Sequence, residues 1–265
     1  MTATTFDKNK FSKVLKELHL PTIRNIYETA VKEAEKNSMR YEEFLFGLME
    51  QERFDREQRK NERLLRQSKL PIDKTMASFD LSRLPMKEVQ KVKGLLDGKF
   101  TDRNENVLAF GNPGSGKTHL LCAIAQTLIK NGKRVYFSSC SMLVQELLVA
   151  KKELKLAKAL KKLSAYDTLV LDDIGYVQQD REEMEVLFTL LAQRYERGSV
   201  MISSNLPFSK WEKIFKDPMT TAAAIDRLVH HSVILELNLS SFRLEAAKKR
   251  SLKTDNKTKQ KNREK

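Results

Sequence analysis

The sequence is poor in cysteine and has no long apolar run, and both absences narrow the classes of protein that it can encode. Its two cysteines, Cys122 and Cys140, offer neither a disulfide framework nor the paired spacing of a metal site. No apolar stretch is long enough to span a bilayer. Residues 1–10 are polar and contain no apolar segment of the kind that directs secretion. We therefore expect a cytoplasmic protein with no membrane partner.

Acidic residues are too few to balance the basic ones. The chain has 35 Asp and Glu against 49 Lys and Arg, which gives a net charge of +14 over 265 residues. Residues 246–265 hold nine basic and two acidic residues, so this tail alone contributes +7. Such a balance favours a polyanionic partner, most often nucleic acid. A tail that only increases solubility has the same composition, and composition does not separate the two.

One glycine-rich stretch lies between an apolar strand-like run and an apolar helix-like run. It fits the pattern G-x-x-x-x-G-K-[ST], and the flanking strand and helix are the context that this phosphate-binding loop requires. The loop consists of Gly111, Asn112, Pro113, Gly114, Ser115, Gly116, Lys117 and Thr118. Its glycines allow backbone N–H groups to face phosphate oxygens, the lysine can reach the β- and γ-phosphates, and the threonine hydroxyl can bind Mg²⁺. The alternative is a glycine-rich turn that binds nothing.

Polar side chains end two later apolar runs. Asp172 and Asp173 follow one run, and Asn205 follows another. We expect Asp172 to hold Mg²⁺ together with Thr118, because this ion prefers oxygen ligands. Asp173 would orient or deprotonate the attacking water, and the Asn205 amide would position that water. Aspartates that cap strand ends, and an asparagine that begins a turn before Pro207, are the alternatives.

Two basic features point beyond a single pocket. Arg227 would be an arginine finger that reaches the ATP of a neighbouring subunit, or it would form an internal salt bridge with Asp226 or Glu236. Residues 151–162 are expected to form one amphipathic basic helix. Contact with DNA phosphates and a merely solvated face are both open for this stretch. Its six lysines are Lys151, Lys152, Lys155, Lys158, Lys161 and Lys162. The adjacent His230 and His231 are not assigned to a metal site.

The order of the patterns predicts two domains. Apolar stripes at helical spacing predict a small all-α domain over residues 1–70, which would dock a partner or contact DNA. Residues 71–100 read as a linker, and residues 246–265 as a basic tail. Between them, over residues 101–245, short apolar strands at 107–110, 134–138, 168–172, 199–203 and 233–237 alternate with helices. This predicts an α/β fold with a five-stranded parallel sheet between helices.

Together, the motifs resemble the AAA+ ATPases of the helicase-loader clade, and the layout is most similar to the IstB family of insertion-sequence transposition helpers. The resemblance rests on the loop with His119, the Leu171–Gly175 strand end, Ser203-Ser204-Asn205 and Asp226-Arg227-Leu228. It implies that the loop is Walker A, that Asp172 and Asp173 are Walker B, that Asn205 is sensor 1 and that Arg227 is the arginine finger. It also implies that His119 and Arg243 contribute to the nucleotide site. Only 28 residues follow Leu237, too few for the helical lid of larger AAA+ proteins.

The resemblance implies a Mg²⁺-dependent ATPase that assembles into a homo-oligomer on DNA and recruits or stimulates a transposase. Backbone contacts imply weak sequence preference. The nearest alternative is a replicative helicase loader of the DnaC or DnaI type. A P-loop kinase of a small metabolite would instead be a monomer without DNA affinity. A non-enzymatic DNA-binding protein would use ATP only to hold its structure.

Overall fold

The computed structural model describes residues 6–175, 181–211 and 218–242, and the chain separates into two compact units between Arg63 and Leu64. The helix that we expected to end the first domain, α3 (Tyr41–Ser68), continues across this boundary. The basic tail lies outside the described residues.

The first unit is helical. It contains α1 (Lys8–Glu17), α2 (Pro21–Lys36) and the first part of α3, packed around buried Leu15, Ile23 and Leu48. Pro21 is the first residue of α2, where its missing N–H costs nothing. The apolar stripe of α3 is only partly used, since Tyr41 is 89% exposed. The expected three-helix unit is therefore present, with a smaller core than the stripe suggested.

The second unit is built on a parallel sheet with the strand order β2-β3-β4-β1-β5. The strands are β1 (Asn106–Gly111), β2 (Val135–Ser139), β3 (Thr168–Ile174), β4 (Ser199–Ser204) and β5 (Ser232–Leu237). All four pairings are parallel, so the predicted five-stranded parallel sheet is confirmed. Because β1 lies between β4 and β5, its carboxyl end is in the interior of the sheet, where ligands bind in this class of fold.

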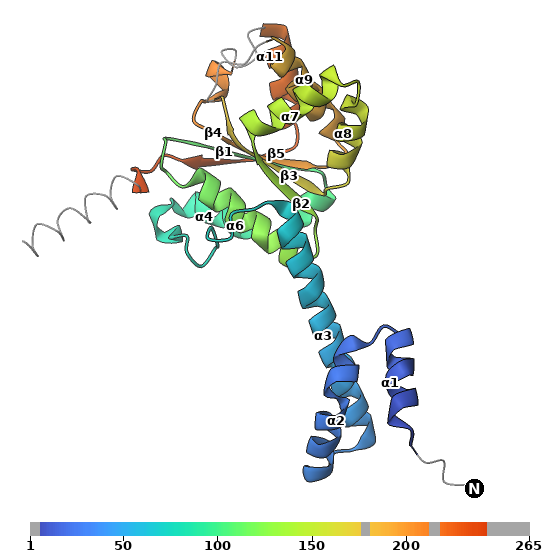
Figure 1. Ribbon diagram of the computed structural model, residues 1–265. Coiled ribbons are helices and arrows are strands. Elements are labelled where there is room, and N and C mark those ends of the chain that lie inside the picture. The colour runs from blue at the N-terminus through green and yellow to red at the C-terminus, as the bar shows by residue number, and fades with distance from the viewer. Residues whose placement is uncertain (1–5, 176–180, 212–217, 243–265) are drawn as a thin grey trace, which may run out of the picture. The chain divides into compact units, whose positions relative to one another are not determined.

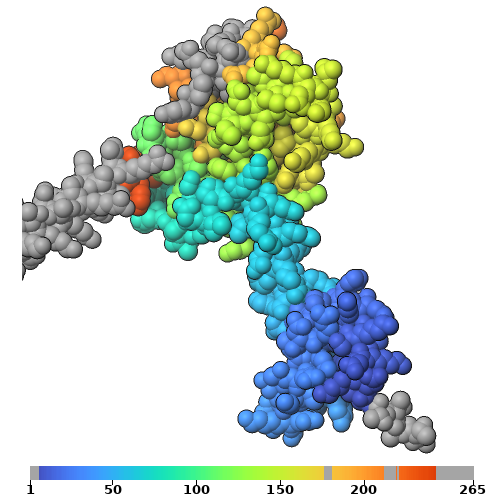
Figure 2. Space-filling view, in the orientation of Figure 1, coloured from blue at the N-terminus to red at the C-terminus, as the bar shows by residue number. Residues whose placement is uncertain are grey.

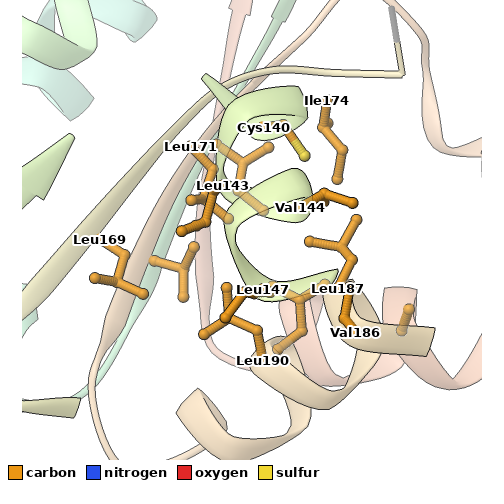
Figure 3. Packing of buried hydrophobic residues seen from close by; sticks show 14 of the residues in the cluster. Cys140, Leu143, Val144, Leu147, Leu169, Leu171, Ile174, Val186, Leu187 and Leu190 are labelled. Carbon is orange, nitrogen blue, oxygen red and sulfur yellow. The ribbon is translucent and has the colours of Figure 1, made fainter. Parts of the chain in front are cut away.

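Helices cover both faces of the sheet (Figure 1). One face carries α6 (Lys117–Lys130) and α4 (Met86–Leu95); the other carries α7 (Cys140–Lys152), α8 (Leu156–Ser164), α9 (Arg181–Arg194) and α11 (Pro218–Val229). Figure 3 shows how α7 packs between the sheet and α9, with Leu143 and Leu147 directed at leucines of both neighbours. This packing fixes the strands whose ends carry the polar residues described below.

Residues 71–100 are structured in their own right. They contain the short helix η1 (Leu81–Arg83), α4 and the start of α5 (Lys99–Asp102). Leu84, Val92 and Phe100 are buried in the same cluster as α6. This stretch, which we expected to be a linker, is therefore a layer of the second unit.

The prediction of a single basic helix over residues 151–162 is wrong. Helix α7 ends at Lys152, Leu154 adopts a left-handed backbone with φ of 58°, and α8 begins at Leu156. Leu154, an apolar residue of this stretch, is 95% exposed. The lysines consequently lie on two helices and, for Lys155, in the turn between them, rather than on one stripe. No glycine or proline marks the break in the sequence.

Candidate active site

The glycine-rich loop lies between the end of β1 and the start of α6, as its pattern requires. Gly111 has φ of 151°, and a Cβ atom there would lie 2.2 Å from the carbonyl oxygen of Leu237 on β5. Gly116 precedes α6 with φ of 98°. Both positions need glycine for steric reasons, and the helix N-terminus beyond them carries the partial positive charge that favours phosphate.

The loop has an unsatisfied donor of its own. Ser115 is 1% exposed, and its hydroxyl oxygen has no hydrogen-bond partner among the described residues. A buried polar atom without a partner costs free energy, so such an atom in a native fold calls for an explanation. A phosphate oxygen in the loop would supply a partner. The residues present therefore fit a nucleoside triphosphate.

Lys117 is folded back onto the loop. Although it is only 6% exposed, its ammonium donates hydrogen bonds to the carbonyl oxygens of Gly111 at 2.8 Å and Asn112 at 2.9 Å, and to Oδ1 of Asn205 at 2.6 Å. These three acceptors hold the charge at the mouth of the loop. It is close enough to the loop amides to act on the same phosphate groups.

The strand-end carboxylates meet the loop through hydroxyl groups. The Thr118 hydroxyl donates to Oδ1 of Asp172 at 2.7 Å, and the Ser203 hydroxyl donates to the same oxygen at 2.6 Å. Thr118 and Asp172 therefore offer two adjacent oxygen atoms, which is the donor set that Mg²⁺ prefers. These two residues would hold the ion.

A register shift between β3 and β4 changes the direction of the Asp173 side chain. The β3–β4 register shifts between Leu171 and Ile174, and Asp173 adopts φ of 63°, an uncommon value for a residue other than glycine. The Asp173 N–H donates to Oγ of Ser203 at 2.8 Å. Nδ2 of Asn205 donates to Oδ1 of Asp173 at 2.9 Å. The bulge allows two consecutive aspartates to take part in one network instead of pointing to opposite faces.

A cavity of about 220 Å³ opens beside the loop. One wall is Phe79, whose ring meets the His119 ring edge-on at 5.4 Å between centroids. Nε2 of His119 lies 3.0 Å from the carbonyl oxygen of Thr75, which ties the segment before Phe79 to α6. Another wall is Phe242, whose N–H donates to the Gly114 carbonyl at 3.0 Å. The aromatic walls next to a phosphate loop provide an apolar place for a base.

Arg227 is an expected site residue that does not line this cavity. Arg227, on α11, donates to the carbonyl oxygen of Ala223 at 2.9 Å and lies 5.0 Å from the centroid of the Phe188 ring. Within the described residues it forms no ion pair with Asp226 or Glu236. Arg243 lies outside the described residues.

The lysines of α7 and α8 also lie away from the cavity lining. Two of them are engaged within the chain: Lys151 pairs with Glu185 at 2.8 Å, and Lys155 pairs with Glu153 at 2.9 Å. Lys152, Lys158, Lys161 and Lys162 are exposed.

Sequence patterns gave no functional role to Ser203 or to the cavity walls. Ser203 is the residue that joins Asp172 to the backbone of Asp173, yet a serine in a strand carries no signature of its own. Arg83 and Phe242 are 159 positions apart in the chain and meet only through folding, with the guanidinium 5.4 Å from the ring centroid.

The family is decided by a comparison with family models. The model described as "IstB-like ATP binding protein" matches residues 13–251 of this chain. The chain belongs to this family. As an IstB-like ATP-binding protein, the chain would hold its nucleotide at the phosphate loop.

Relatives agree with the family, and a solved structure shares the fold. A putative insertion sequence ATP-binding protein of Sinorhizobium fredii is 41% identical over 244 residues, covering 92% of this chain and 82% of the relative. The putative ATP-binding protein of insertion sequence IS21 from Pseudomonas aeruginosa is 37% identical and covers 92% of both chains. The crystal structure of the DnaC helicase loader matches with a TM-score of 0.53 and 17% identity, covering 62% of this chain and 97% of that one. That last likeness shows the shared fold alone. Among the described residues, no helix is both long and apolar enough to cross a membrane.

Proposed function

We propose that this IstB-like protein is a Mg²⁺-dependent ATPase that assembles on DNA and recruits or stimulates a transposase. The observation that carries the ATPase part is the hydrogen-bonded network that joins the phosphate loop to the ends of β3 and β4. It links Thr118 to Asp172 and, through Asn205, Lys117 to Asp173. A loop that only bound nucleotide as a structural element would have no need of a second carboxylate at this place.

The roles of the side chains follow from their positions. Bound ATP with Mg²⁺ would supply the phosphoryl group to be transferred and the charge that stabilises its transfer. Lys117 binds phosphate oxygens, and Thr118 and Asp172 hold the ion. Asp173 accepts the proton of the attacking water, and Asn205 orients both Asp173 and that water. The Phe79 and Phe242 rings line the cavity and would contact the base.

Assembly through the nucleotide is supported by the position of Arg227. The guanidinium is anchored on α11 by a carbonyl and an aromatic ring, and among the described residues it makes no hydrogen bond to the network of the phosphate loop. We propose that it reaches the ATP of the next subunit and stabilises the transition-state charge. The helical first unit and the basic tail would then serve as interaction modules for the partner and for DNA.

One experiment separates the parts of this proposal. ATP hydrolysis and the size of the protein are measured with and without ATP and duplex DNA, for the wild type, Lys117→Ala and Asp173→Asn. Lys117→Ala should lose ATP binding. Asp173→Asn should bind ATP, fail to hydrolyse it and accumulate as DNA-bound oligomers. Normal turnover by Asp173→Asn would refute the general-base role, and a wild type that stays monomeric with ATP and DNA would refute the assembly.

The insertion-sequence names of the relatives favour a transposase as the partner over a replicative helicase. Affinity capture of the ATP-bound protein against a purified transposase and a purified replicative helicase tests this choice. Capture of the helicase alone would favour the loader function.

A further inference from the structure

A basic pocket lies at the edge of the sheet formed by β2, away from the phosphate loop. Its volume is about 550 Å³. It is formed where the last turn of α3, the start of β2 and the end of α8 come together within the second unit. Its lining is Arg66, Gln67, Lys69, Arg134, Tyr136, Lys162, Ala165 and Tyr166. Four of these eight residues are cations and none is acidic.

Internal ion pairs account for only two of the four cations. The Lys69 ammonium lies 3.9 Å from Oε1 of Glu146, and Nε of Arg134 lies 3.9 Å from Oδ2 of Asp167. Both distances are at the long end of the range for an ion pair. Arg66 and Lys162 have no acidic partner within 4.0 Å among the residues that the structure describes.

The rims of the pocket are fixed by aromatic and backbone contacts. Lys69 donates to the hydroxyl of Tyr136 at 3.1 Å, and the Tyr136 and Tyr166 rings lie 5.2 Å apart. The Arg134 N–H donates to Oδ2 of Asp167 at 2.6 Å. The cations therefore project from an ordered surface, and their mutual repulsion costs free energy in the folded state. An anion in the pocket would relieve that cost.

The positive surface continues beyond the pocket along α8. Lys158 and Lys161 are exposed on the helix face opposite buried Leu160 and Leu163. In Figure 2 the yellow-green residues of the α7–α8 region form a continuous part of the surface of the second unit. A row of cations longer than one pocket matches a chain of phosphates better than a single small anion.

We propose that this pocket binds the phosphodiester backbone of DNA, an inference that rests on the DNA-binding part of the proposed function. The chemistry favours backbone over bases. Tyr136 is buried and its hydroxyl is engaged by Lys69, so its face is not offered to a base. Lysine and arginine heads at an open rim contact phosphate oxygens without reading sequence. The pocket is the place where the end of α3 meets the exposed lysines of α8.

The test removes the two cations without an acidic partner, in the double variant Arg66→Gln/Lys162→Gln. Binding of a fluorescent duplex is measured from about 0.05 to 0.3 M salt in the presence of ATP. Each lost phosphate contact lowers the slope of log K against log salt by about 0.9, so the slope should fall by about 1.8 and the affinity at 0.1 M salt by roughly 60-fold. The control is Lys87→Gln/Lys93→Gln, which removes the same charge from exposed positions of α4, next to the opposite edge strand β5. Circular dichroism checks that both variants are folded.

The outcomes separate this inference from the function on which it rests. A reduced slope for the pocket variant with a wild-type slope for the control supports the pocket. If the wild type binds DNA but the pocket variant keeps the wild-type slope, the pocket inference alone is overturned. The same holds if the pocket variant and the control lose slope equally. A wild type without DNA affinity overturns both. A pocket variant that loses affinity for ATP instead of DNA would show that the pocket takes free nucleotide, which also overturns the inference.

Discussion

Removing the Ser203 hydroxyl should uncouple catalysis from ATP binding. This hydroxyl donates to Asp172 at 2.6 Å and accepts from the N–H of Asp173 at 2.8 Å. Ser203→Ala deletes both hydrogen bonds and leaves the loop, Lys117 and Thr118 in place. The substitution is therefore expected to act on the position of the two carboxylates and not on the affinity for the triphosphate.

The expected loss of stability follows from the two lost hydrogen bonds. A hydrogen bond to a charged group contributes about 1.5–3 kcal/mol, and a buried N–H left without a partner costs about 1–3 kcal/mol. Part of this is recovered by relaxation and by water, so we expect a loss of stability of roughly 2–4 kcal/mol. Loss of a group that orients a metal ligand lowers activity about 10–100-fold. We expect kcat to fall by that factor, with KM for ATP changed less than about threefold.

The assay is steady-state ATP hydrolysis at several magnesium concentrations, with thermal unfolding measured in parallel. Because Asp172 loses one of its two orienting hydroxyls, the magnesium concentration for half-maximal activity should rise. The matched control is Ser204→Ala. The Ser204 hydroxyl is equally buried, but it bonds to the backbone of Ile174 and Leu206 and touches neither aspartate. It should lower the melting temperature and spare kcat. Equal kcat in Ser203→Ala and the wild type would refute the positioning role.

Three further predictions concern other parts of the second unit. Arg194 is buried and donates to three backbone carbonyls. In Gly198→Ala the new Cβ would lie 2.3 Å from that guanidinium, so denaturant titration should show a loss of stability of roughly 2–4 kcal/mol. An unchanged denaturation midpoint would contradict this. Burial raises the pKa of the Cys122 thiol from 9.0 to about 12, so between these pH values the native thiol stays protonated, and iodoacetamide at pH 9 should label it rapidly only after unfolding. Arg227→Ala should lose ATPase activity but regain part of it when mixed with Lys117→Ala subunits, because each inactive subunit supplies what the other lacks; mixtures without activity would argue against a role in trans.

The local motifs were sufficient for the class of fold. Five short apolar runs, separated by helical stretches, predicted a parallel sheet, and the structure has five strands at those places. This worked because a strand buried on both faces has to be continuously apolar, which is a property of adjacent residues. The same reasoning failed at residues 151–162, where the break at Leu154 has no glycine or proline to mark it. There α7 and α8 are two helices in contact with each other, which the local pattern does not specify.

The sequence by itself determined which groups could bind phosphate and its metal ion. The glycines, Lys117 and Thr118 act through a backbone conformation and a spacing that neighbouring residues specify. The two aspartates are recognisable because they come directly after the apolar run of a strand. Only the tertiary structure decided how these groups meet. The strand order placed β4 between β3 and β1, and so brought Ser203 to Asp172 and Asn205 to both Lys117 and Asp173. The aromatic walls and the basic pocket came from segments far apart in the chain. Contacts of this kind depend on which elements pack together, and no pattern of neighbouring residues specifies that.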